Sequence, residues 1–225
     1  MKLVVVGGHS RNIGKTSVAA SLIAATRDLG WTALKLTQYG HSLCSARGRV
    51  CDCAPEDPAH PVSITREESR DGRHDTSRFL AAGAVEAYWV RTPQGRLARA
   101  MPEIHRLIDG KRFVIMESNS VLRFLKPDFY LVVLDPSVSD FKASSREHLD
   151  RADVFLVLDE PPGTGAAFAP LLPGSGGAHD VALETRPAWA NVPWTLLERR
   201  PLYRIRPPDY LPADLAALLR ARLHS

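Results

Sequence analysis

The stretch that decides the fold is KLVVVGGHSRNIGKTS, residues 2–17. Its first part is continuously apolar, which predicts a strand buried on both faces, as in a parallel sheet. A polar loop follows, and Gly14-Lys15-Thr16 then opens a helical pattern. The backbone N–H groups of such a loop and the start of the following helix converge on phosphate oxygens. The alternative is an ordinary strand-to-helix turn that contains Gly-Lys-Thr by chance.

The spacing of this loop differs by one residue from the common phosphate-binding signature. That signature places its first glycine five positions before the glycine of Gly-Lys-Thr, and here that position is His9. Counted from Gly8, five residues separate the two glycines. We predict that Lys15 reaches the terminal phosphates and that Thr16 ligates Mg²⁺. The expected nucleotide contacts are Gly8, His9, Ser10, Arg11, Asn12, Ile13, Gly14, Lys15, Thr16 and Ser17.

Length and composition narrow the class of protein. The 225 residues suit one sizeable domain. The apolar runs are of strand length, far short of the roughly 20 residues of a membrane span, and the first residues do not lead to a signal-peptide cleavage site. We therefore expect a cytoplasmic protein without a membrane partner. The arginines are scattered and no nucleic-acid motif has a recognisable spacing, so we expect no nucleic-acid partner.

Alternating strand and helix patterns predict an α/β fold, a mostly parallel sheet with helices on both faces. The sequence predicts strands at 2–7, 31–37, 85–91, 112–117, 128–135 and 153–159, and helices at 16–29, 75–84, 95–108, 144–152 and 211–223. Pro102 is expected to interrupt the third helix early, and Pro212 to lie in the first turn of the last. The side chains expected to face inward are Val18, Leu22, Ala25 and Leu29 in the first helix, and Leu215, Leu218 and Leu219 in the last.

We expect a single domain over residues 1–225, with an insertion at about 38–72 and a loop or lid at about 159–178. The insertion contains all three cysteines, Cys44, Cys51 and Cys53, together with His41. Thiolates and an imidazole are typical ligands of Zn²⁺ or an Fe–S cluster. The alternatives are solvent-facing cysteines or a substrate-binding loop of small residues. An odd number of cysteines without a secretion signal argues against a disulfide framework.

The longer phosphate loop resembles that of dethiobiotin synthetase and its relatives in the SIMIBI class of P-loop NTPases. In that enzyme a lysine closes the second strand, and a glutamate at the end of a later strand binds Mg²⁺. The segments ALKLTQ and RFVIMESNS offer Lys35 and Glu117 at these places. The resemblance implies catalytic roles for Lys15, Lys35 and Glu117, with Thr16 and Glu117 holding Mg²⁺. The alternatives are a surface lysine and a solvated strand end.

The segments KLTQYGH and DGRHDTSRFLAAGA carry a second resemblance, to MobB, the molybdopterin-guanine dinucleotide biosynthesis protein B of the same class. After its Walker-B-like strand that family has Glu-Gly-Phe-Lys, where this chain has Glu-Ser-Asn-Ser. We therefore take Ser118 and Asn119 as candidate substrate contacts. Arg78, about one turn into the helix that Thr76 begins, is a third candidate, with a surface arginine as the alternative, and we expect Asp75 to cap this helix. The matching residues, carried by KLTQYGH and DGRHDTSRFLAAGA, are Lys35, His41, Gly72, Asp75, Thr76, Arg78, Ala82, Gly83 and Ala84.

Together these resemblances imply a Mg²⁺-dependent hydrolase of ATP or GTP that acts as an adaptor or switch in molybdenum-cofactor or other metallocofactor assembly. Its implied partner is a metalloenzyme maturation protein, and dimers are common in these families. Two alternatives stay open: an ATP-dependent synthetase that activates a small carboxylate or carbamate, and a nucleotide- or metal-binding module without turnover. Residues 133–157 resemble the metal-insertion GTPases UreG and HypB, but LVLD at 156–159 replaces their guanine-selecting motif, so the preferred base is open.

Overall fold

The computed structural model describes residues 1–40, 62–138, 140–159 and 199–224. The predicted metal ligands His41, Cys44, Cys51 and Cys53 lie outside the described residues, as does most of the predicted lid.

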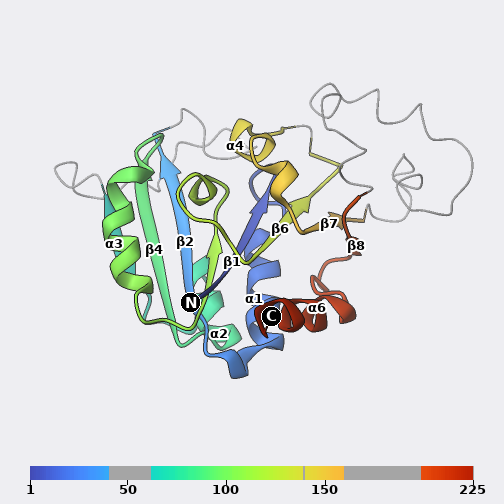
Figure 1. Ribbon diagram of the computed structural model, residues 1–225, viewed down its shortest axis with the longest axis horizontal. Helices are drawn as coiled ribbons and strands as arrows, with labels where there is room; N and C mark the ends of the chain where they lie inside the picture. The colour runs from blue at the N-terminus through green and yellow to red at the C-terminus, as the bar shows by residue number, and fades with distance from the viewer. Residues whose placement is uncertain (41–61, 139, 160–198, 225) are drawn as a thin grey trace, which may run out of the picture.

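One sheet of eight strands organises the described chain, in the order β3-β4-β2-β5-β1-β6-β7-β8. Neighbouring strands are parallel except β3 and β4, which are antiparallel. The carboxyl ends of the central strands lie at the top of Figure 1. The strands are β1 (Lys2–Gly8), β2 (Thr32–Tyr39), β3 (Ser63–Arg66), β4 (Glu86–Pro93), β5 (Phe113–Glu117), β6 (Phe129–Leu134), β7 (Val154–Leu158) and β8 (Leu202–Ile205).

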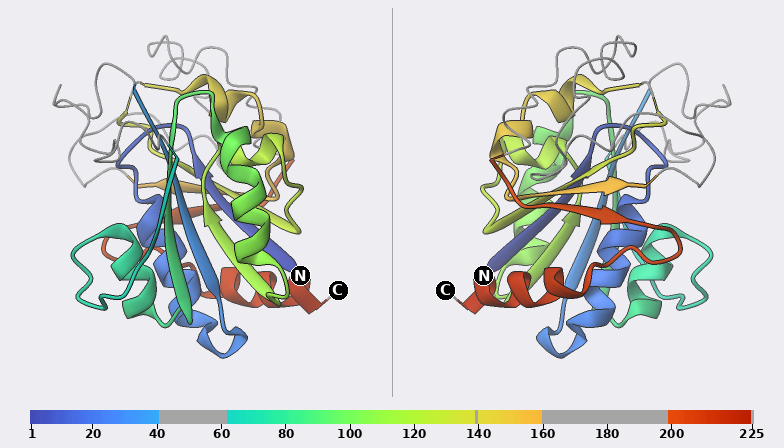
Figure 2. Two further views of the ribbon diagram at one scale, coloured as in Figure 1. Left: turned by 90° about the vertical axis from the view of Figure 1, so that its left-hand side faces the viewer. Right: turned by 90° about the vertical axis from the view of Figure 1, so that its right-hand side faces the viewer.

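Helices cover both faces of this sheet, as predicted. α1, α2 and α6 pack on one face, whereas α3 lies on the other (Figure 2). The helices are α1 (Lys15–Ala25), α2 (Asp75–Ala82), α3 (Met101–Ile108), α4 (Ala143–Arg146) and α6 (Ala213–His224), with 3₁₀ turns at Arg27–Leu29, Leu97–Ala100, Ser120–Arg123 and Leu149–Arg151. The fold class predicted from the sequence is therefore confirmed.

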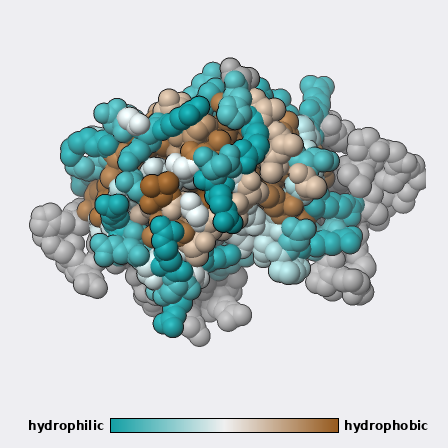
Figure 3. All heavy atoms as spheres, turned by 90° about the horizontal axis from the view of Figure 1, so that it is seen from below, coloured by the Kyte–Doolittle hydropathy of each residue, from teal (hydrophilic) through white to brown (hydrophobic). Residues whose placement is uncertain are grey.

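The core has two layers because the central strands are buried on both faces. In β1, Leu3 and Val5 face the α3 layer, while Val4 and Val6 face the layer formed with α1, α2 and α6. None of the helices within the described ranges has the length and apolar composition needed to cross a membrane. Seen from below, hydrophobic residues lie among hydrophilic ones at the surface (Figure 3).

The first helix differs from the prediction at its end. α1 stops at Ala25, which is exposed, so the expected inward position of Ala25 is wrong. The cause is Thr26, which leaves the helical conformation and is fully buried. Its hydroxyl donates to the Leu22 carbonyl at 2.6 Å and accepts from the Trp31 indole N–H at 2.9 Å. These bonds turn the chain into β2.

The terminal helix also differs in detail. Leu215 and Leu219 are buried as predicted, but Leu218 is only partly buried, and Leu223 completes the inward face. Pro212 precedes the helix, and its carbonyl accepts a hydrogen bond from the Leu215 N–H at 3.0 Å. The expected interruption by Pro102 is wrong: a 3₁₀ turn precedes α3, and Pro102 lies in the first turn of α3, where its missing N–H has no consequence for the helix.

Two short edge strands were not predicted. β3 lies within the expected insertion, and β8 lies in a region without a recognisable pattern. Each has four residues and forms one edge of the sheet. Strands of this length are too short for the alternation of apolar and polar residues to be distinctive.

A close contact at Gly7 provides a test of the fold. A Cβ atom on Gly7 would overlap Asn119 Oδ1 and lie 2.8 Å from the Tyr130 hydroxyl oxygen. We expect Gly7→Ala to lower the free energy of unfolding by about 1–3 kcal/mol, the usual effect of overpacking. Urea denaturation checks this, with Asn119→Ala and the double variant completing a mutant cycle. The double variant should lose less stability than the sum of the single changes, and an unchanged Gly7→Ala protein would contradict the predicted contact.

Candidate nucleotide-binding site

The predicted phosphate loop, residues 9–14 between β1 and α1, provides the backbone of the site. Gly14 is the N-cap of α1 and has φ +87°, a conformation that favours glycine. A Cβ at Gly14 would also lie 2.7 Å from a ring carbon of Tyr210. The first N–H groups of a helix have no partner within it, and no acidic residue lies in the first turn of α1. The helix start thus attracts an anion.

The Lys15 side chain folds back onto this loop, and its contact with phosphate stays a prediction. Its ammonium donates a hydrogen bond to the Ser10 carbonyl. Burial lowers the pKa of Lys15 to about 8, and the nearby charges of Lys35 and Arg11 act in the same direction, against Glu117. A negatively charged group at this place would stabilise the ammonium form.

Glu117 lies beside the start of α1 because of the strand register. It ends β5, where it pairs with Val6 of β1 on one side and Lys35 of β2 on the other. The Thr16 hydroxyl, from the first turn of α1, donates to Glu117 Oε2 at 2.7 Å. The predicted Mg²⁺ ligands Thr16 and Glu117 therefore meet, although they are 101 positions apart.

Lys35 joins the same group. Its Nζ lies 3.2 and 3.3 Å from the two Glu117 oxygens and 3.4 Å from Thr16 Oγ1, and it also pairs with Asp75. Burial acts to lower the pKa of Lys35, but the negative charges of Glu117 and Asp75 outweigh it, so the pKa is raised. Lys35 is therefore charged and held by two carboxylates rather than lying free on the surface.

Asp75 does not cap α2, so this interpretation of its role is wrong. The N-cap is His74, whose N–H donates to Ser77 Oγ at 2.9 Å, while the Ser77 hydroxyl donates back to the His74 carbonyl. Asp75 is instead the first helical residue and turns its carboxylate to Lys35. Asp75 thus belongs to the site through its ion pair with Lys35, a role that the sequence did not predict.

The three candidate substrate residues occupy different surroundings. Arg78 donates to Ser17 Oγ at 2.8 Å, at the start of α1. Ser118 lies just before the 3₁₀ turn that follows β5, and its Oγ accepts from the Val121 N–H at 3.2 Å. The Asn119 amide exchanges two hydrogen bonds with the Gly8 backbone, at 2.9 and 2.8 Å. Asn119 therefore fixes the start of the phosphate loop, and substrate contact by these residues stays a prediction.

The His9 ring packs against the segment that follows β6, and nucleotide contact by His9 stays a prediction. The ring is fully buried, with Nδ1 accepting from the Asp135 N–H at 3.4 Å and Nε2 3.3 Å from the Val138 carbonyl. It also packs on Phe141, with 5.1 Å between ring centroids. Burial lowers the pKa of His9 to about 4. His9 is therefore a neutral anchor for the segment after β6.

Other residues close to the phosphate loop were missed by sequence reasoning. Ser10 Oγ donates to Asp140 at 2.7 Å, and the Lys142 N–H donates to the His9 carbonyl at 2.8 Å. Tyr210 packs against Gly14 from the segment after β8. No motif marked these residues. Asp159, the last residue of the LVLD segment that replaces the guanine-selecting motif, pairs with Arg204 at 3.1 Å and with Arg206.

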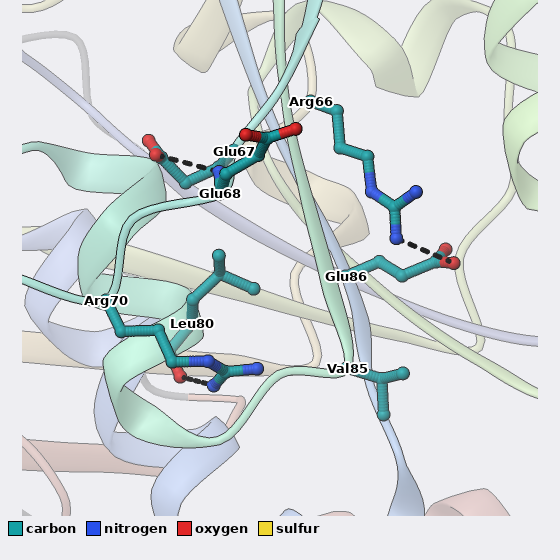
Figure 4. Close-up of a pocket in the computed structure, with 7 residues that line it drawn as sticks. All are labelled: Arg66, Glu67, Glu68, Arg70, Leu80, Val85 and Glu86. Atoms are coloured by element: carbon teal, nitrogen blue, oxygen red, sulfur yellow. Dashed lines mark hydrogen bonds and ion pairs between the residues drawn. The ribbon is translucent and has the colours of Figure 1, made fainter.

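A separate pocket of about 270 Å³ lies near the beginning of β4, whereas the phosphate loop lies at the strand ends. Figure 4 shows that its charged groups are engaged locally: Arg66 pairs with Glu86, and Arg70 donates to the Leu80 carbonyl. The remaining lining residues are Glu67, Glu68 and Val85. This pocket is not part of the predicted site.

No protein-family model matches the chain, and no curated protein matches it in sequence. Among solved structures, the chain is similar to HypB from Helicobacter pylori in complex with nickel, with a TM-score of 0.50 and 12% identity over 98% of this chain and 86% of that one. It is also similar to LpxK from Aquifex aeolicus in complex with ATP, with a TM-score of 0.41 and 16% identity over 70% of this chain and 48% of that one.

The chain has the α/β fold of a P-loop NTPase. The likeness to HypB concerns the fold, and the more specific resemblance to MobB and dethiobiotin synthetase stays a prediction. Within the described ranges, no cluster of three or more His, Cys, Asp or Glu side chains is arranged to hold a metal ion by itself.

The buried His9 ring predicts a loss of stability in acid. Because its pKa is about 4 in the folded chain and near 6.5 in an unfolded one, the unfolded state binds the proton more readily between these values. Its contribution is fully present above pH 6.5 and falls by up to about 3 kcal/mol as the pH drops through 4.

Urea denaturation between pH 7 and pH 5 checks this prediction. His9→Gln should be less stable than the wild type at pH 7 and lose less stability on acidification. The exposed His105 provides the control, since His105→Gln should keep the wild-type slope. Equal slopes in all three proteins would show that His9 is not the buried neutral group described here.

Proposed function

We propose that the chain binds a nucleoside triphosphate with Mg²⁺ at the start of α1 and hydrolyses it. The observation that carries this proposal is the convergence of Lys15, Thr16 and Glu117 at a helix start with unpaired N–H groups. Such an arrangement offers positive charge to phosphates and oxygen ligands to a divalent cation. Catalysis of phosphoryl transfer rests mainly on positioning and charge stabilisation, which these residues supply.

The donor set fits Mg²⁺, which prefers hard oxygen ligands. The Thr16 hydroxyl and the Glu117 carboxylate would hold the ion, and Asp75 is a third oxygen donor reached through the shared contact with Lys35. When bound, Mg²⁺ would neutralise charge on the phosphates. Lys35 now donates to these same oxygens, so a metal ion there requires the Lys35 ammonium to move toward the phosphates.

For the biological role, we propose an adaptor or switch in metallocofactor assembly that acts on a metalloenzyme maturation partner. This rests on the sequence resemblance to MobB and to the metal-insertion GTPases, and on clustered cysteines in the segment that follows β2. A molybdenum-cofactor pathway and a Zn²⁺ or Fe–S site at those cysteines belong to the same proposal. A preference for GTP would favour this adaptor role, whereas a preference for ATP would favour the alternative of an ATP-dependent synthetase.

Calorimetric titration with Mg²⁺–ATP and Mg²⁺–GTP tests nucleotide binding. We expect saturable binding of at least one nucleotide, and a loss of about 10- to 150-fold in affinity for Lys15→Ala, the usual range for a hydrogen bond to a charged group. Lys111→Ala serves as the control, because Lys111 pairs with Glu86 at the beginning of β4. If neither nucleotide binds, or if Lys15→Ala retains full affinity, the proposed site is wrong.

The role of Asp75 is tested by the Mg²⁺ dependence of nucleotide hydrolysis. If Asp75 supports the metal site, Asp75→Asn should raise the Mg²⁺ concentration for half-maximal activity by about tenfold, as removal of an outer-shell group commonly does. Asp71→Asn removes a nearby carboxylate that pairs with Arg73 instead, and it should behave like the wild type. An unchanged Mg²⁺ requirement in Asp75→Asn would restrict the metal site to Thr16 and Glu117.

A further inference from the structure

The segment between β6 and α4, described over residues 135–138 and 140–142, is fixed to the phosphate loop at several points. The Lys142 N–H donates to the His9 carbonyl at 2.8 Å, and the His9 N–H donates to the carbonyl of Val133 in β6, just before this segment, at 3.2 Å. Ser10 Oγ donates to Asp140 at 2.7 Å. This segment comes from the strand next to β1, so it reaches the loop from the side opposite to Lys35 and Glu117. The backbone of Lys142 is thus positioned by the phosphate loop itself.

The ammonium group of Lys142, unlike its backbone, has no bonding partner among the described residues. The side chain is partly buried, yet no hydrogen bond or ion pair joins its ammonium to any residue in the described part of the chain. Asp140, two positions earlier in the chain, accepts the Ser10 hydroxyl through Oδ2, and its charge acts on Lys142 without a direct ion pair. Burying a cation without a partner is costly, so the arrangement points to an anion that completes it.

Neighbouring positive charges strengthen this argument. Burial lowers the pKa of Lys142 to about 7, with the charges of Lys15 and Arg11 adding to the effect and those of Asp140 and Glu117 opposing it. Burial also lowers the pKa of Lys15, and the charges of Lys35 and Arg11 act in the same direction, against Glu117. Three cations therefore lie within electrostatic reach of one another around the phosphate loop. A multiply charged anion would relieve this repulsion, whereas a neutral ligand would not.

We propose that Lys142 is a further catalytic residue of this site, whose ammonium contacts the terminal phosphate together with Lys15 and stabilises the charge of its transfer. This rests on the proposed nucleotide hydrolysis. In that reaction, a water oxygen forms a bond to the γ-phosphorus as the bond to the β–γ bridging oxygen breaks. The bond's electron pair stays on the nucleoside diphosphate, and the proton lost by water passes to solvent. Lys142 makes no bond and holds its proton throughout.

The test compares three variants: Lys142→Met, Lys142→Arg and the exposed control Lys126→Met. For each, the hydrolysis rate is measured, and calorimetry gives the affinities for the nucleoside triphosphate and the nucleoside diphosphate with Mg²⁺. Loss of one charge-stabilising donor usually lowers kcat by about 10²–10³-fold. We expect that loss in Lys142→Met, together with a reduced preference for triphosphate over diphosphate, while diphosphate affinity stays within about threefold of the wild type. Lys142→Arg, which keeps the charge, should recover part of the rate, and Lys126→Met should match the wild type.

The outcomes distinguish a failure of the proposed role of Lys142 from a failure of the proposed nucleotide hydrolysis. Wild-type hydrolysis with an unchanged rate and unchanged triphosphate preference in Lys142→Met would overturn the role of Lys142 and leave the nucleotide site intact. Absence of binding by the wild type would overturn both. If thermal melting shows that Lys142→Met does not fold, Lys142→Gln takes its place, and a wild-type rate in that variant would equally overturn the assignment.

Discussion

The hydrogen bond from the Thr16 hydroxyl to Glu117 is the interaction on which the arrangement of the site depends. It connects the first turn of α1 to the end of β5, and it forms because β1 and β5 are parallel neighbours in the register Val6 to Glu117. These strands are buried on both faces. A shift of register by one residue would exchange the side chains between the two core layers and move Glu117 away from the loop. The same strand register therefore determines both the packing of the core and the position of Glu117 in the site.

The site also shows how buried charges are arranged around a phosphate loop. On the side of β2 and β5, Lys35 lies between the carboxylates of Asp75 and Glu117, so positive and negative charges balance. On the side of β6, Lys142 adds positive charge near Lys15, and the nearby carboxylate is engaged by Ser10. The first side suits a divalent cation that replaces an ammonium, and the second suits the anion that such a cation accompanies. A Mg²⁺–nucleotide complex carries both.

The parts of this arrangement that are local in sequence could be predicted. The loop from Gly8 to Thr16, the carboxylate at the end of β5 and the lysine of β2 each follow a recognisable strand or helix pattern. Asp75 was found in the right segment but given the wrong role, because Asp at a helix start is usually a cap. Its pairing with Lys35, 40 positions away, depends on how α2 packs against β2. Asp140, Lys142 and Tyr210 lie in irregular segments, where no periodicity indicates which side chains meet the loop.

The most direct test of this account is a crystal structure of the chain with Mg²⁺ and a non-hydrolysable nucleoside triphosphate. We predict phosphate oxygens at the first N–H groups of α1 and at Lys15, Mg²⁺ bound by Thr16 and Glu117, and the Lys35 ammonium moved from its place between the carboxylates of Asp75 and Glu117. Electron density for the nucleotide at another place, or Lys35 unmoved with no metal beside Thr16, would contradict this prediction.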